Sequence, residues 1–239
     1  MTGKPAQPGK GPPTPRDELD EWIDRACEQD DLAEPLLDAE VVDDDVTSPL
    51  SPEDIRKARA DLAVWRAPLD FRAAVVALLK RSRSREFFNN PGHQFLRDAF
   101  VLAEFVEREP VDRVRLAAQS EQWPDGYVRI GNETKNVEIT SADVPGRRIG
   151  DEYKFPTEAK LDPVDNWVQR AAAIPGALEK AISAKVAKRY GSPALLIVYL
   201  NINEWGIREA ETERAIIEIK QRHSASFDGL FVLWKGKLL

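Results

Sequence analysis

The chain of 239 residues is long enough to bury one hydrophobic core, with or without appendages. Hydrophobic residues make up 42% and charged residues 31%, as is usual for a soluble protein. The one cysteine, Cys27, excludes a disulfide framework and a cysteine-based zinc site, and two histidines are too few for a histidine-rich metal centre. We therefore expect a reducing, cytoplasmic setting. No apolar run approaches the roughly 20 residues of a membrane span, and the N-terminus lacks the apolar segment of a signal peptide.

The net charge of −7 conceals an uneven distribution along the chain. Residues 17–45 carry 14 acids and one base, whereas residues 46–239 carry 27 acids and 30 bases. An acidic arm beside a mildly basic body indicates a polyanionic partner, an autoinhibitory arm or a contact for a protein partner; a solubilising tail is the alternative. We divide the chain into a disordered Pro/Gly-rich tail (1–16), the acidic arm and linker (17–50), a helical extension (51–92) and an α/β domain (93–239).

The helical extension begins with a clear start signal, Ser51 as N-cap followed by Pro52 at the first helical position. We predict one helix from there to about residue 65, interrupted by Pro68, and a second helix over residues 69–81. The second helix runs into a basic segment around two serines, made up of Lys80, Arg81, Arg83 and Arg85. These cations are candidates for contacts with nucleic-acid phosphates, although a solvated helix end whose cations suit the helix dipole gives the same pattern.

The remaining chain has the pattern helix, strand, strand, strand, helix, strand, helix, strand. Helical and strand periodicities place these elements at residues 93–109, 113–118, 126–130, 136–141, 175–190, 194–202, 209–222 and 229–235. Three consecutive strands predict an antiparallel meander, and the later β-α-β units add strands by crossover connections. The expected fold is therefore α/β, with one mixed central sheet flanked by helices.

Two acids lie on neighbouring strands of the predicted hairpin. Asp125 opens one strand, and Glu138 lies in the next, where it shares a face with Thr140 because strand side chains alternate. Two close carboxylates suit a hard cation such as Mg²⁺ or Mn²⁺; a surface hairpin with solvated acids is the alternative. Asp98 lies at the edge of the apolar stripe of the preceding helix, whereas Glu104 projects from the opposite side, so Asp98 is the better-placed third acid.

Candidate cations follow the hairpin in the chain. Within the predicted helix 175–190, Lys185 lies about 20° from Ile174, in the middle of the apolar stripe. A lysine there either extends to the helix end or reaches a carboxylate partner. The loop over residues 142–164 contains Arg147, Arg148 and Lys154, and a loop of that length in a compact domain is often functional.

The element order, the pair of Pro124 and Asp125 at the second strand and the Glu-x-Thr of the third strand resemble the core of the PD-(D/E)XK nuclease superfamily. This superfamily has a restriction-endonuclease-like αβββαβ core, and the resemblance covers residues 93–235. It implies Mg²⁺ held by Asp125 and Glu138, with Asp98 completing the metal shell. It also implies DNA as the substrate, with RNA as the alternative. In the superfamily, a lysine two residues after the glutamate orients or activates the attacking water.

Thr140 stands at that lysine position and departs from the superfamily pattern, because a hydroxyl supplies no cation beside a scissile phosphate. Some members bring the lysine from the following helix, which implies Lys185 as the catalytic lysine and leaves Lys154 as the alternative. Arg147 and Arg148 are implied phosphate contacts but poor proton acceptors, since arginine stays protonated.

Three functions remain open on these grounds. The first is a Mg²⁺-dependent endonuclease or exonuclease acting on DNA. The second is a catalytically inactive protein of the same fold that binds nucleic acid or a partner protein; the missing strand lysine favours it and the retained acids oppose it. The third is a regulatory protein in which residues 17–45 mimic nucleic acid or contact a protein partner.

Overall fold

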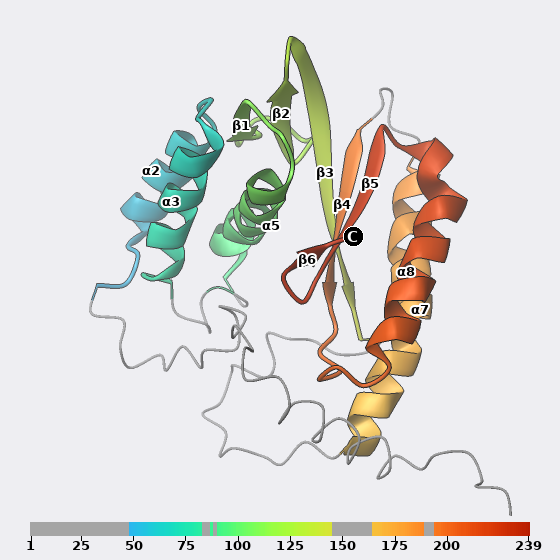
Figure 1. The fold of residues 1–239 in the computed structure, drawn as a ribbon. Coiled ribbons are helices and arrows are strands. Elements are labelled where there is room, and N and C mark those ends of the chain that lie inside the picture. Colours follow the sequence, from blue (N-terminus) through green and yellow to red (C-terminus); the bar gives the residue numbers. More distant parts are fainter. Residues whose placement is uncertain (1–47, 83–86, 88–89, 145–163, 189–193) are drawn as a thin grey trace, which may run out of the picture.

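The computed structural model describes residues 48–82, 87, 90–144, 164–188 and 194–239 (Figure 1). Within those residues the α-helices are α2 (Pro52–Leu62), α3 (Pro68–Leu79), α5 (Gln94–Arg108), α7 (Val164–Ala187) and α8 (Glu209–His223). The described strands form one sheet in the order β1 (Arg113–Leu116), β2 (Gly126–Ile130), β3 (Glu133–Asp143), β4 (Leu195–Asn201), β5 (Gly229–Trp234) and β6 (Lys237–Leu238). In this part of the chain, no helix combines the length and the hydropathy that crossing a bilayer requires.

The sheet is mixed, because antiparallel and parallel connections both occur. Strands β1, β2 and β3 form an antiparallel meander, β4 and β5 run parallel to β3, and β6 returns antiparallel to β5. Helices α7 and α8 supply the crossovers that parallel neighbours need. The predicted α/β class, with a mixed sheet flanked by helices, is confirmed. The expected order of helix, three strands, helix and strand is found from α5 to β4.

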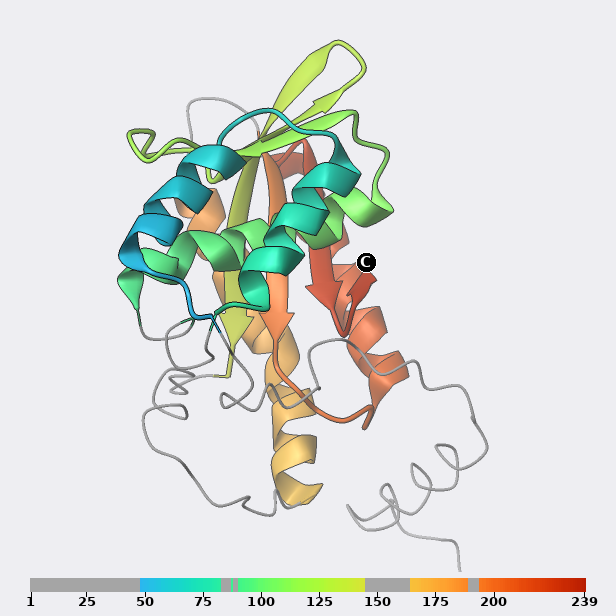
Figure 2. The same ribbon diagram turned by 90° about the vertical axis from the view of Figure 1, so that its left-hand side faces the viewer.

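Alternating side chains of the sheet build a hydrophobic core on each face. Val137 and Ile139 of β3 pack in one core with α2, α3 and α5. Leu196 and Val198 of β4 pack in the other core with α7 and α8. Figure 2 shows α2, α3 and α5 in front of the sheet and α7 and α8 behind it, with the β2–β3 hairpin projecting beyond the helices. The helical extension thus shares a core with the sheet.

The helix starts follow local signals in the sequence. Ser51 caps α2 in a capping box: its side chain accepts from the Asp54 N–H, and the Asp54 carboxylate accepts from the Ser51 N–H. Pro68, which we expected only to interrupt the first helix, is the first residue of α3. Proline suits that position because the first N–H of a helix has no intrahelical partner.

Helix α7 differs from the prediction. We expected Pro175 at its first position, but α7 begins at Val164 and contains Pro175 in its interior. The prediction was wrong because it treated the proline as a start signal, although the apolar stripe continues upstream through Ala171, which is buried. An interior proline removes one backbone hydrogen bond. Packing of the helix on the sheet outweighs that loss.

The short strand β6 was not predicted, and it follows a two-residue turn. Lys235 and Gly236 have φ values of 49° and 71°. Positive φ at both central residues is what the tightest hairpin turns require, and glycine adopts it without strain. A strand of two residues carries too little alternation to be recognised in the sequence.

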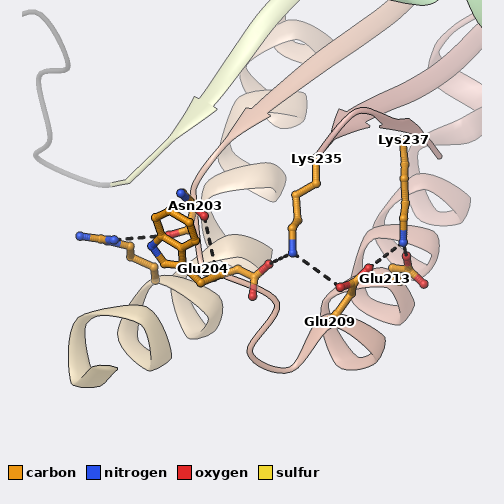
Figure 3. Close-up of polar contacts among 8 residues, drawn as sticks. Asn203, Glu204, Glu209, Glu213, Lys235 and Lys237 are labelled. Carbon is orange, nitrogen blue, oxygen red and sulfur yellow. Dashed lines mark hydrogen bonds and ion pairs between the residues drawn. The ribbon is translucent and has the colours of Figure 1, made fainter. Parts of the chain in front are cut away.

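A chain of ion pairs anchors this turn to α8 and to the segment after β4 (Figure 3). Lys235 Nζ lies 3.1 Å from Glu204 Oε1 and 3.6 Å from Glu209 Oε2. Lys237 Nζ lies 2.6 Å from Glu209 Oε1 and 2.9 Å from Glu213 Oε1. The Glu204 side chain is 0% exposed, and its burial raises the pKa of its carboxyl group. The C-terminal hairpin is therefore held by charge as well as by backbone pairing.

Candidate active site

The strand register brings two of the predicted acids together. Gly126 pairs with Val137 in the antiparallel β2–β3 ladder. The next position of that register puts Asp125 opposite Glu138 on the same face of the sheet, with Cβ atoms roughly 5 Å apart. The Ile139 N–H donates to Asp125 Oδ2 at 2.7 Å and so fixes the Asp125 carboxylate.

A glycine next to Asp125 allows the sheet to approach α5 closely. A Cβ atom on Gly126 would lie 2.9 Å from Leu102 Cδ2 and 3.1 Å from the Arg115 carbonyl oxygen. Both distances are too short for a side chain to fit without movement of its neighbours. Gly126 therefore lets β2 lie close to α5.

Asp98, on α5, is the third predicted acid. Burial, together with the charges of Asp125 and Glu138, raises the pKa of Asp98 to about 7, while a neighbouring arginine and Lys185 oppose the shift. Burial also raises the pKa of Asp125, and so does the charge of Glu138. Carboxylates influence one another in this way only when they lie close together in a poorly solvated place. The charges of Asp125 and Glu138 therefore act on Asp98, and its place as the third acid of a metal shell stays a prediction.

Lys185 reaches these acids from α7. Its ammonium group contacts Glu138 Oε1. Of the two routes expected for a lysine in an apolar stripe, Lys185 takes the carboxylate partner. The Glu138 side chain is 4% exposed and that of Lys185 is 13% exposed, so little water screens the ion pair. Sequence reasoning missed Lys188, which follows three residues later and acts to lower the pKa of Asp125. Its spacing from Lys185 was the available signal.

Thr140 and Glu104 are the remaining hydroxyl and acidic candidates. Thr140 lies beside Val198 in the β3–β4 register and is half-buried, on the Glu138 face of β3. Glu104 forms an ion pair with Arg108 on its own helix, with Glu104 Oε2 at 3.0 Å from the guanidinium. Glu104 is thus engaged within α5, and the choice of Asp98 as the third acid stays a prediction.

The predicted nucleic-acid contacts are described only in part. Lys80 is exposed, as expected. Arg81 is half-buried, contrary to the exposed run we predicted, because its guanidinium bonds to the Ser48 carbonyl and the Asp54 carboxylate, both at 3.0 Å. It therefore anchors the start of α2. The other predicted cations and the acidic arm lie outside the described residues: Arg83, Arg85, Arg147, Arg148, Lys154 and residues 17–45.

The donor set fits Mg²⁺ in chemistry and charge. Asp125 and Glu138 offer carboxylate oxygens, Lys185 is ion-paired with Glu138, and burial together with the charges of both acids raises the pKa of Asp98. Among the described residues there is no group of three aspartate, glutamate, histidine or cysteine side chains that could hold a metal ion. Mg²⁺ does not need one, because it is usually held by one or two carboxylates, substrate phosphates and water. Asp125 and Glu138 would hold the ion, with Asp98 beside them.

Comparison of the chain with protein-family models, with curated proteins and with solved structures found no match.

Proposed function

We propose that the chain is a Mg²⁺-dependent nuclease that hydrolyses phosphodiester bonds of DNA. One observation carries the proposal: Lys185 of α7 contacts the buried Glu138, which lies opposite Asp125 in the strand register. This arrangement supplies the cation that Thr140 cannot supply from the third strand. It resembles the PD-(D/E)XK nuclease pattern with the lysine moved to the following helix.

In hydrolysis the water oxygen bonds to phosphorus, the bond from phosphorus to one sugar oxygen breaks, and a proton from water ends on the departing oxygen. The bound cation lowers the pKa of water and neutralises charge on the phosphate. Asp125, fixed by the Ile139 N–H, and Glu138 hold their carboxylates in place before substrate arrives. Lys185 faces the charge that builds on the phosphate, and its partial burial strengthens that interaction.

Incubation of the protein with plasmid, linear duplex and single-stranded DNA, with Mg²⁺ or Mn²⁺, tests the proposal. We expect Asp125→Asn, Glu138→Gln and Lys185→Met each to lower cleavage at least about a hundredfold, as loss of one charge-stabilising group does in other enzymes. Glu104→Gln is the matched control, because this acid lies on α5 but pairs with Arg108. Equal inactivity of wild type and all variants with either metal would refute the nuclease function.

A catalytically inactive nucleic-acid-binding protein is the second candidate. Thr140 at the lysine position and the lack of a ready three-residue metal cage among the described residues favour it. The same set of variants distinguishes the two candidates. An inactive binding protein would bind DNA without cleaving it, and Asp125→Asn would leave its affinity unchanged or raise it by removing a negative charge.

A further inference from the structure

In the part of the chain that the structure describes, helices cover only part of the sheet face that carries Asp125 and Glu138. Helix α7 packs on β3 and β4 of this face, and α8 packs on β5. Among the described residues, neither helix packs to a similar extent on β1 or β2. Strands β1 and β2 therefore extend beyond these two helices, and their side chains on this side share a face of the sheet with Asp125 and Glu138.

Alternation along the strands determines which side chains lie on this uncovered part. Val114 and Val128 are buried in the core on the α5 side. Their neighbours along each strand must point the other way. The side chains on the uncovered part are Arg113, Arg115, Tyr127 and Arg129. Arg129 lies four residues beyond Asp125, about 13 Å along the strand.

Two of these arginines lie directly opposite each other. Arg113 pairs with Arg129 in the antiparallel register, and both are exposed. Neither forms an ion pair with an acid of the described residues. Like charges directly opposite in a sheet are destabilising. This pair therefore opposes folding, and an anion between the two guanidinium groups would relieve the repulsion.

Aromatic rings hold the neighbouring guanidinium groups in fixed planes. Arg129 lies 5.1 Å from the Trp65 ring centroid. Arg115 lies 4.0 Å from that of Tyr127, and its guanidinium also bonds to Glu121 at 3.2 Å. Arg115 donates to Glu121 and to the Leu116 carbonyl, so its donors are engaged within the protein. Stacking of Arg129 on Trp65 leaves the edge of the Arg129 guanidinium available to phosphate oxygens. It also covers the aromatic faces that single-strand binding proteins use to stack bases.

We propose that Arg113 and Arg129 form a phosphate-binding surface that holds the backbone of duplex DNA beside the acids. The inference rests on the proposed function for its substrate. The occupant is a duplex because its bases are already stacked on one another and only its phosphates need partners. A span of 13 Å corresponds to about four base pairs at 3.4 Å each, so this surface contacts the duplex about four base pairs from the acids.

Binding to a duplex of about 20 base pairs, measured by fluorescence anisotropy in EDTA over a range of salt concentrations, tests this surface without cleavage. We expect Arg113→Gln and Arg129→Gln each to weaken binding about tenfold at low salt, as loss of a charged hydrogen bond does. Each should also reduce the slope of log affinity against log salt by about one. Arg56→Gln is the matched control, because this exposed arginine lies on α2, on the other side of the sheet.

Thermal unfolding separates binding from a structural role. Because Arg113 is repelled by Arg129, Arg113→Gln should leave the melting temperature unchanged or raise it while DNA affinity falls. Unchanged affinity and salt slope in both variants would overturn the surface, even if the wild type cleaves DNA. Tighter binding of a single strand of the same length would overturn the assignment to a duplex. Loss of binding in the variants of a protein that never cleaves would support the surface and refute hydrolysis.

Discussion

The ion pair between Lys185 and Glu138 allows a direct test of the site by stability. Replacing Lys185 with methionine keeps the apolar stem and removes the charge, which leaves Glu138 at 4% exposure without its cation. Removing one partner of a buried pair costs about 3–5 kcal/mol. Because Lys185 is 13% exposed, we expect the lower end, about 3 kcal/mol. In a domain of this size the melting temperature would then fall by about 6–12 °C.

A second substitution identifies the cause. The double variant Lys185→Met with Glu138→Gln carries no unpaired charge at this position, so it should recover about 2 kcal/mol of the loss. Thermal unfolding at pH 7 in EDTA measures both quantities. Mg²⁺ should raise the melting temperature of Lys185→Met more than that of the wild type, because the ion replaces the lost positive charge. A melting temperature within about 2 °C of wild type, or strictly additive effects of the two substitutions, would refute the reasoning.

Three further predictions concern Asp98, Gly126 and Lys235. In EDTA, Asp98→Asn should be more stable than wild type above pH 7, by up to about 4 kcal/mol, and equal to it below about pH 4. The Asp98 carboxyl has a pKa of about 7 in the folded protein against 3.8 in the unfolded chain, so the folded protein binds this proton more tightly. The stability of the wild type therefore falls as the pH rises from 3.8 to about 7. A stability difference between variant and wild type that does not depend on pH would contradict this prediction. Gly126→Ala should lower stability by about 1–3 kcal/mol through overpacking against α5, whereas Gly176→Ala, in open space on α7, should not lower it. Equal melting temperatures of the two variants would show that α5 moves to make room for the methyl group. Lys235→Met should cost about 3 kcal/mol by leaving the fully buried Glu204 unpaired, and a loss below 1 kcal/mol in denaturant unfolding would show that other groups compensate.

Local patterns were sufficient to predict the elements that surround the site. Alternation located β2 with both bounds as observed, and helical geometry placed Lys185 in the apolar stripe, where it had either to extend to the helix end or to reach a carboxylate. The same local reasoning failed at Pro175, because proline marks helix starts and also occurs inside helices whose packing outweighs the lost hydrogen bond.

The arginine pair could not be predicted from the sequence. Arg113 and Arg129 are separated by an irregular connection between β1 and β2, and their opposition depends on the register of the two strands. Alternation shows which face of each strand is buried, but register also depends on turn geometry, and the irregular connection between β1 and β2 gives no turn signal that fixes it. The raised pKa of Asp98 has a similar origin, since it depends on acids from two other elements.

The position of Lys185 makes the site sensitive to changes far from any substrate. A lysine on β3 would keep a fixed distance from Glu138, because the strand backbone joins them. Lys185 is 47 residues away along the chain, and its distance from Glu138 is set by how α7 lies on the sheet. Ile182, one turn earlier and fully buried, helps to set that packing. Under the proposed function, mutations in the hydrophobic core would change the rate of hydrolysis without changing any residue proposed to contact DNA. Fewer substitutions in this core should then preserve activity than preserve stability.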